Sequence, residues 1–180
     1  MNFIVTPFEG LIIIEPKIFR DHRGYFFESY NNDIFKEKGI PFDFMQDNQS
    51  LSNKGVLRGL HFQLPPFEQG KLIRVLKGAV LDICVDIRKS SSTFGKYFSI
   101  ELNGNSNQML WVPPGFAHGF LTLENETIFL YKCTNLYNKE SEKGILYNDP
   151  DLNIKWGDVK PVLSGKDLEL PLLKELIDLI

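Results

Sequence analysis

Hydrophobic and polar residues alternate, or form short apolar runs, along most of the chain. The clearest alternation covers residues 98–103, where Phe98, Ile100 and Leu102 are separated by polar positions, a pattern typical of a strand with one buried face. Turn residues separate such segments at intervals of about 8–12 residues, which indicates a sandwich or barrel. The predicted strands cover residues 11–14, 25–30, 56–63, 71–76, 79–87, 98–103, 109–112, 119–123 and 127–134.

Two segments have helical spacing instead. Residues 31–38 begin with asparagine and aspartate, which suit the start of a helix, and residues 171–180 place leucines and isoleucines on one face. The stretch 135–166 is rich in Asn, Asp, Gly and Pro and predicts long loops with at most one short strand. The pattern therefore predicts a mainly β fold, a barrel or sandwich with a few short helices, including one at the C-terminus.

Length and composition narrow the class of protein. The chain has 180 residues, which is about one domain, so we expect a single domain over 1–180. Twenty Lys and Arg against 23 Asp and Glu give a net charge of −3, which disfavours a general nucleic-acid binder. No apolar run is long enough for a membrane span, and the N-terminus lacks a signal-peptide pattern. Cys84 and Cys133 lie in apolar runs, as expected for buried reduced thiols in a cytoplasmic protein.

The three histidines are the first candidates for chemistry. His22 lies in a polar turn and is expected at the surface, whereas His61 lies in the predicted strand 56–63. Alternation would place His61 on one face with Leu57 and Gln63, and would place Arg58, Leu60 and Phe62 on the other. A lone histidine on a strand is more often structural than catalytic.

His118 belongs to a pattern of wider interest. Pro113, Gly115 and His118 resemble the second half of the cupin metal signature. The first half would need a second histidine where this chain has Gln63, and Glu68 lies beyond two prolines in a loop. Two histidines without a third strong ligand make a poor transition-metal site. The sequence therefore resembles a cupin-type barrel that has lost its metal.

Several cationic residues and one tyrosine are further candidates for the site. Arg58 and Lys71 lie near His61, and Arg23, Arg74 and Lys166 are further candidates to bind an anionic ligand such as a diphosphate. For each of them a surface charge is the plainer interpretation. Tyr131 shares a face with Phe129 and Cys133, where it is a candidate core residue as well as a candidate site residue. Asp167 precedes the last predicted helix, where capping is its plainest role.

Seven motifs, in order over nearly the whole chain, resemble the dTDP-4-dehydrorhamnose 3,5-epimerase family. Together they are far more specific than any one of them alone. The matching segments are residues 21–28, 46–50, 56–63, 71–75, 112–120, 131–134 and 163–167.

The resemblance implies a fold, an assembly and a set of roles. It implies a cupin-type jelly roll that forms a homodimer and uses no metal and no redox cofactor. It implies that His61 is the general base, Asp167 its partner carboxylate, Tyr131 the acid on the opposite side of the sugar, and Lys71 the group that faces the enolate oxygen. The positions that match nucleotide and diphosphate contacts are Arg23, Glu28, Gln46, Asn48, Arg58, His118, Glu142 and Lys166.

Some of these assignments carry alternatives or conditions. Arg23 and Glu28 match positions that reach the site of the neighbouring subunit. Glu142 is placed by its distance from Tyr131, with Glu140 as a competitor, and Tyr137 is a candidate to stack on the nucleotide base.

The implied reaction inverts C3 and C5 of dTDP-4-dehydro-6-deoxy-D-glucose to give dTDP-4-dehydro-L-rhamnose, a step of dTDP-L-rhamnose biosynthesis. The C4 carbonyl makes the hydrogens on C3 and C5 more acidic. One base whose pKa lies near neutral pH can therefore remove a proton from either carbon. The alternatives are an epimerase that acts at C3 only, a 4-keto sugar isomerase, a non-catalytic sugar-binding module and a metal-dependent oxygenase. We expect a nucleotide-diphosphate sugar as the partner, and neither nucleic acid nor membrane.

Overall fold

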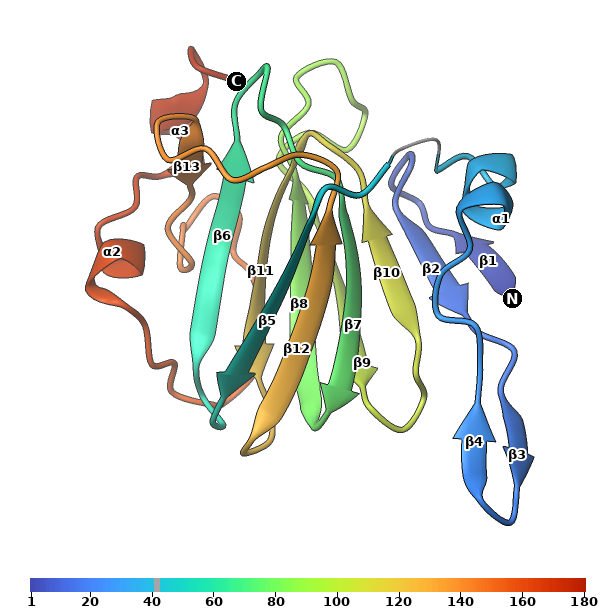
Figure 1. Ribbon diagram of the computed structural model, residues 1–180. Helices are drawn as coiled ribbons and strands as arrows, with labels where there is room; N and C mark the ends of the chain where they lie inside the picture. The colour runs from blue at the N-terminus through green and yellow to red at the C-terminus, as the bar shows by residue number, and fades with distance from the viewer. Residues whose placement is uncertain (41–42) are drawn as a thin grey trace.

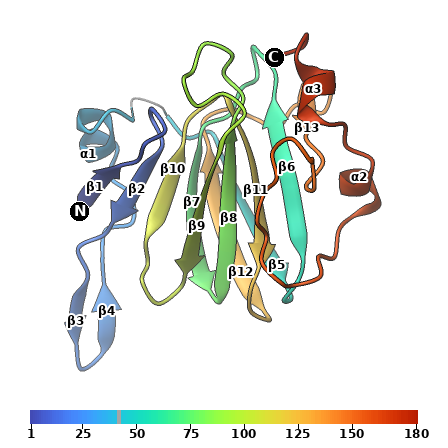
Figure 2. The ribbon, with the colours of Figure 1, turned by 180° about the vertical axis from the view of Figure 1, so that it is seen from behind.

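The computed structural model describes residues 1–40 and 43–180, and its described part is built mainly from antiparallel strands (Figures 1 and 2). Six strands form one sheet in the order β1 (Asn2–Val5), β2 (Ile12–Glu15), β10 (Met109–Val112), β7 (Lys71–Lys77), β12 (Thr127–Cys133) and β5 (Gln46–Ser52). Five form a second sheet in the order β13 (Glu142–Gly144), β6 (Leu57–Gln63), β11 (Phe116–Thr122), β8 (Ala79–Asp86) and β9 (Tyr97–Asn103). The mainly β jelly-roll prediction is confirmed.

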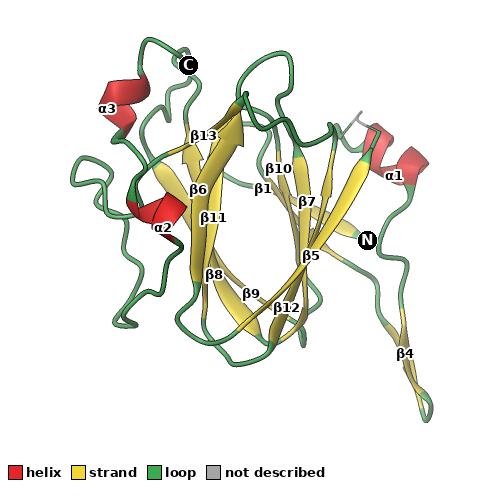
Figure 3. Cartoon of the chain, turned by 60° about the vertical axis from the view of Figure 1, so that its left-hand side comes forward, coloured by secondary structure: helices red, strands yellow, loops and turns green. Residues whose placement is uncertain are grey.

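Three apolar clusters hold these layers together. The inner faces of the two sheets meet in a cluster that includes Ile73, Val80 and Phe129, all at most 1% exposed. A second cluster lies on the outer face of the six-stranded sheet beneath Phe35, and a third joins the outer face of the five-stranded sheet to the C-terminal segment through Trp156. Figure 3 shows the two sheets edge-on, with β5 in one sheet and β6 in the other. A cavity opens between these two strands, and we call this the open side of the sandwich. That open side is where the polar inner face can meet a ligand.

The helices are short. The first, α1 (Asn32–Glu37), begins where the sequence predicts it, and the Asn31 side chain accepts from two backbone N–H groups of the first turn. The C-terminal helix α3 (Leu173–Leu176) is shorter than the predicted 171–180. A third helix, α2 (Gly165–Leu168), was not predicted as a helix. The N-cap of α2 is Ser164 and that of α3 is Leu172, so the capping role considered for Asp167 is wrong. None of the helices in the described ranges is long and apolar enough to cross a membrane.

The N-terminal third departs most from the predicted strands. Of the predicted strand 25–30 only its beginning is extended, as β4 (Gly24–Phe26), which pairs with β3 (Phe19–Asp21) in a two-stranded hairpin. This hairpin projects away from both sheets (Figure 1). The strand β5 was missed because Gln46–Ser52 is almost entirely polar. It is an edge strand, so one of its edges needs no partner, and its inner face borders the open side of the sandwich rather than the core.

The strand β6 is irregular near its centre. His118 pairs with His61 and Phe120 with Arg58, so that three residue steps on β6 oppose two on β11. Gly59 sits at this bulge with φ of +122°, and a Cβ there would lie 2.5 Å from Gly119 Cα. The predicted alternation is therefore wrong: Leu57 packs with Leu60 and Phe62 in the core, and Arg58 joins His61 on the open side.

Candidate active site

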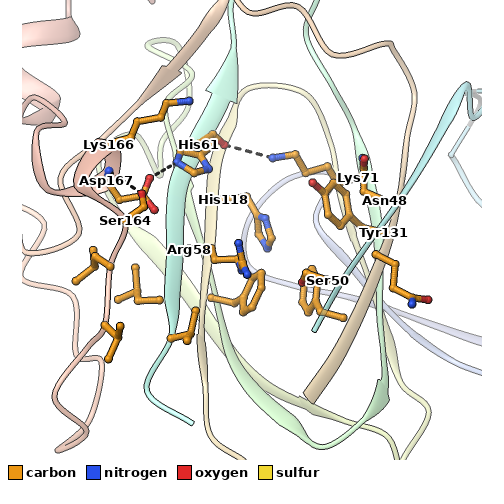
Figure 4. Close-up of a pocket in the computed structure, with 17 residues that line it drawn as sticks. Asn48, Ser50, Arg58, His61, Lys71, His118, Tyr131, Ser164, Lys166 and Asp167 are labelled. Carbon is orange, nitrogen blue, oxygen red and sulfur yellow. Dashed lines mark hydrogen bonds and ion pairs between the residues drawn. The ribbon is translucent and has the colours of Figure 1, made fainter. Parts of the chain in front are cut away.

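A cavity of about 580 Å³ opens between the two sheets on the side of β5 and β6 (Figure 4). Side chains of both sheets line it, together with the segment that leads into α2. The sequence-predicted residues that it brings together are Asn48, Arg58, His61, Lys71, His118, Tyr131, Lys166 and Asp167. All four residues with expected catalytic roles are therefore on one cavity, although they come from three strands and a helix.

His61 and Asp167 form the most direct contact of the site. His61 Nε2 lies 2.6 Å from Asp167 Oδ1, and the Asp167 side chain is only 6% exposed. Burial alone would raise the pKa of Asp167, but hydrogen bonds from His61, Ser164 and the Gly59 backbone outweigh it and hold that pKa below its usual value. Asp167 is consequently ionised at neutral pH and accepts a hydrogen bond from Nε2–H. The lone pair of the imidazole then resides on Nδ1.

Lys71 and Tyr131 lie on strands of the opposite sheet. Lys71 begins β7, is 9% exposed, and its Nζ donates to the backbone oxygen of His61 at 3.3 Å. Burial lowers the pKa of Lys71 below its usual value. Burial also raises the pKa of Tyr131 to about 12, so that its phenol is protonated at neutral pH. Figure 4 shows His61 on one wall of the cavity and Tyr131 on the other, with Lys71 between them and the back of the cavity formed by His118.

His118 has a partner that sequence reasoning missed. Its Nε2 lies 3.0 Å from both carboxylate oxygens of Asp82, which is completely buried on β8. Burial lowers the pKa of His118 in spite of this carboxylate, so the ring is neutral at neutral pH and donates Nε2–H to Asp82. An aspartate that interrupts the apolar run 79–87 was the available signal, since a buried charge needs a partner.

Asp82, Cys84 and His118 form the one group among the described residues with metal-ligand atoms within 4.8 Å of one another. Its chemistry does not fit a cation well. His118 already occupies both Asp82 oxygens, and burial raises the pKa of the Cys84 thiol well above its usual value. A thiol must lose its proton to ligate a metal. The group is therefore better explained as the support of His118.

The polar groups at the rim are connected to one another. Glu142 accepts from Lys166 Nζ at 2.5 Å and from Tyr137 Oη at 2.7 Å. Burial opposes but does not overcome the effect of these two donors, which lower the pKa of Glu142. Gln46 donates to Asn48 Oδ1 at 2.9 Å. Gln46 and Glu142 thus contact residues that line the cavity without lining it themselves.

Three candidate cations or acids lie elsewhere in this chain. Arg23, at the tip of the β3–β4 hairpin, pairs with Asp21 and its side chain is 79% exposed. Glu28 follows the hairpin and accepts from Asn31. Arg74, considered above as a ligand for an anion, lies over the ring of Phe27 at 4.6 Å. None of the three lines the cavity formed by this chain.

Comparison with known proteins gives the same family as the motifs. The family model for dTDP-4-dehydrorhamnose 3,5-epimerase matches residues 5–175. The enzyme of that name from Shigella flexneri is 51% identical over 169 residues, which are 93% of this chain and 93% of that one. The crystal structure of the Legionella pneumophila dTDP-6-deoxy-D-glucose-3,5-epimerase in complex with dTDP-4-keto-L-rhamnose has a TM-score of 0.92 at 48% identity, covering 96% of this chain and 93% of that chain.

A structure with lower sequence identity is also similar in fold. ChmJ, a 3'-monoepimerase from Streptomyces bikiniensis in complex with dTDP-quinovose, has a TM-score of 0.92 at 32% identity, covering 98% of this chain and 90% of that chain. Both structural relatives hold a dTDP sugar. With a family model over most of its length and relatives near half identity, the chain belongs to the dTDP-4-dehydrorhamnose 3,5-epimerase family and is an enzyme of the isomerase class.

Proposed function

We propose that this enzyme, as a single domain over 1–180, inverts C3 and C5 of dTDP-4-dehydro-6-deoxy-D-glucose to give dTDP-4-dehydro-L-rhamnose. The observation that carries the proposal is the placement of a carboxylate-bonded histidine and a protonated tyrosine on facing walls of one cavity. Inversion needs a proton removed from one face of a carbon and returned to the other, so a base and an acid must face each other across the sugar.

His61 acts as the base through Nδ1. Asp167, ionised and bonded to Nε2, fixes this tautomer and stabilises the imidazolium that forms when a proton is taken from C3 or C5. The proton comes from a carbon next to the C4 carbonyl, and the electron pair of the C–H bond moves into an enolate whose charge resides on O4. The reaction therefore consists of proton transfers alone and needs neither a redox cofactor nor a metal.

Lys71 and Tyr131 complete the cycle. Lys71 is buried, and burial lowers its pKa. Its ammonium group stabilises the negative charge that develops on O4 of the enolate, and this charge in turn stabilises the protonated lysine. Tyr131 then gives its proton to the opposite face of the carbon and becomes a tyrosinate, while His61 holds the abstracted proton. Proton exchange with solvent restores both groups before the second carbon reacts. A pKa of about 12 keeps Tyr131 protonated until it donates.

The nucleotide and diphosphate occupy the rest of the cavity. Besides Lys71, the cationic side chains that line the cavity are Arg58 and Lys166, and Asn48 and His118 add neutral polar groups. The guanidinium of Arg58 suits a diphosphate because its planar fork can make paired contacts. Glu142 and Gln46 act at the rim through the side chains that they contact.

The proposal includes a homodimer in which the hairpin reaches the partner's cavity. Arg23 and Glu28 match family positions for nucleotide contacts but lie away from this chain's own cavity. The hairpin also exposes Phe19, Tyr25 and Phe26 by 54%, 51% and 71%. Large apolar side chains on a projecting hairpin are typical of a protein interface. Two free buried cysteines agree with the proposed cytoplasmic location.

The second candidate function is epimerisation at C3 alone, which is favoured by the similarity to ChmJ, a 3'-monoepimerase. Both reactions need the same base and acid. The product distinguishes them, because inversion at C3 alone leaves C5 in its original configuration.

The test is to incubate the wild-type enzyme and the His61→Asn variant with the 4-keto sugar nucleotide and identify the products by NMR. We expect the L-rhamno ketone from the wild type and no product from the variant. Calorimetric titration with dTDP should show that the variant still binds the nucleotide. Normal turnover by a folded His61→Asn variant would contradict the assignment of the base.

A further inference from the structure

Gln63 makes three side-chain hydrogen bonds, two of them with segment 135–138 at the cavity rim and one with the loop that follows β6. Its side-chain amide donates to Phe67 O at 2.6 Å and to Leu136 O at 3.2 Å. Its side-chain oxygen accepts from the backbone N–H of Asn138 at 2.8 Å. Gln63 is 7% exposed, so these bonds are shielded from water. This residue takes the position at which the cupin signature has a metal-binding histidine.

Two further glutamines bind the same segment. Gln46 Oε1 accepts from the backbone N–H of Tyr137 at 2.9 Å, and Gln69 Nε2 donates to Asn135 O at 2.8 Å. Four successive residues, 135–138, are therefore each bonded through the backbone to a glutamine side chain. We call Gln46, Gln63 and Gln69 the glutamine clamp.

The clamp joins the two sheets. Gln46 belongs to β5, the edge strand of one sheet, and Gln63 to β6 of the other. The segment that they hold leaves the end of β12 and crosses to β13 beside β6 (Figure 1). It has no regular secondary structure of its own, so side chains supply the hydrogen bonds that would otherwise come from a strand partner.

The held segment carries Tyr137, the candidate to stack on the nucleotide base, and leads to Glu142. Tyr137 is 52% exposed, and its hydroxyl donates to Glu142, which in turn binds Lys166 of the cavity wall. Asn138 also accepts from the backbone N–H of Glu142 at 3.1 Å, so the position of Glu142 follows that of the segment.

We propose that Gln63, together with Gln46 and Gln69, is a positioning residue that fixes segment 135–138 across the cavity rim and thereby sets the affinity for the nucleotide end of the substrate. This inference rests on the proposed function for the identity of the ligand. Its structural part, the fixing of the segment, does not. A segment that is already ordered loses less conformational entropy when the ligand binds.

Gln63→Met tests the inference, because methionine is similar in length but makes none of the three bonds. The exchange of the Asn138 amide hydrogen, followed by NMR, should accelerate by at least about tenfold. KM for the sugar nucleotide should rise about tenfold while kcat changes by less than about twofold, since the side chains that handle the protons are not altered. A tenfold change corresponds to about 1.4 kcal/mol, within the range for one or two neutral hydrogen bonds.

Gln108→Met is the matched control. Gln108 donates a side-chain hydrogen bond to Glu15 at 3.1 Å and lies outside the cavity lining, so this variant should keep the wild-type exchange rates and kinetics. Gln69→Met, which loses only the bond to Asn135, should show the same effects as Gln63→Met but smaller, and it replaces Gln63→Met if that variant fails to fold.

The possible outcomes test separately whether the glutamines fix segment 135–138 and whether this fixing sets the affinity for the substrate. Unchanged exchange at Asn138 would overturn the clamp itself, and faster exchange with unchanged KM would overturn its role in affinity. A fall in kcat with unchanged KM would also overturn it, because it would place Gln63 in the chemical step. If the wild type neither turns over the sugar nucleotide nor binds dTDP, the proposed function fails, and exchange at Asn138 still decides whether the glutamines hold the segment.

Discussion

Asp167→Asn tests the His61–Asp167 pair with a minimal change of shape. Asp167 accepts hydrogen bonds from His61 Nε2 and from the backbone N–H of Gly59. An asparagine has only one acceptor oxygen to offer these two donors. If its NH2 group faces Gly59, that group and the backbone N–H of Gly59 are two donors with no acceptor between them. If its NH2 group faces His61, Nε2 must accept the hydrogen bond. The ring proton then moves to Nδ1, which is the atom that needs its lone pair to act as the base.

The size of the effect follows from the contact. The 2.6 Å bond joins a nearly buried carboxylate to an imidazole that becomes cationic when it takes a proton. Hydrogen bonds to charged groups contribute about 1.5–3 kcal/mol, which corresponds to a loss of roughly 10- to 150-fold in rate. The misplaced tautomer adds to this loss, so that figure is a lower bound for the variant.

The assay is uptake of deuterium from D2O into the sugar nucleotide, followed by NMR, with dTDP affinity measured on the same sample. Ser164→Ala is the control, because it removes the 3.1 Å bond that caps α2 and the Ser164 hydrogen bond to Asp167, but leaves the Asp167 carboxylate and its bond to His61 in place. It should cost about 0.5–2 kcal/mol of stability and much less activity than Asp167→Asn. An Asp167→Asn variant that exchanges within about twofold of the wild-type rate would refute this explanation of the pair.

Three further predictions concern other parts of the molecule. Tyr131→Phe should retain deuterium uptake better than product formation, and its ultraviolet pH titration should lose the phenol that ionises near pH 12; equal loss of both activities would remove its role as the acid of one face. Mixed dimers of Arg23→Ala and His61→Asn subunits, each inactive alone, should regain about a quarter of wild-type activity, because half of random dimers contain one intact site; no recovery after verified exchange of subunits would contradict the crossing hairpin. Burial would raise the pKa of Asp86, but hydrogen bonds from Arg88 and two hydroxyl groups lower it to about 2. This stabilisation is present above pH 4 and lost as pH falls towards 2, so urea unfolding should show Asp86→Asn less stable than wild type by about 2 kcal/mol at pH 7, and by much less near pH 2.

Local hydrophobic patterns in the sequence predicted most of the fold. The strands from 71 to 133 were predicted within a few residues because their apolar side chains are buried between or beneath the sheets. The strand Gln46–Ser52 escaped prediction because its inner residues border a polar cavity, where hydrophobic alternation has no physical cause. The short helix α2 likewise carries no apolar stripe, and its four residues are held by a cap and by the contact of Asp167 with β6.

The site depended on contacts that no local pattern contains. His61 and Asp167 are 106 residues apart in the chain, and only the family resemblance paired them before the structure did. The face of Arg58 was predicted wrongly, because a bulge at Gly59 reverses the alternation and nothing in the alternation itself reveals a bulge. The support of His118 by Asp82 was signalled only by a charged residue inside an apolar run.

The most direct measurement is the position of deuterium in the sugar after wild-type enzyme is mixed with dTDP-4-dehydro-6-deoxy-D-glucose in D2O. Proton removal by His61 and return by Tyr131 at both carbons next to the C4 carbonyl predicts deuterium at C3 and at C5 in an L-rhamno product. Deuterium at C3 alone would contradict double inversion and establish the C3 epimerase instead. No deuterium at either carbon, in folded protein that binds dTDP, would contradict the proposed chemistry of the cavity altogether.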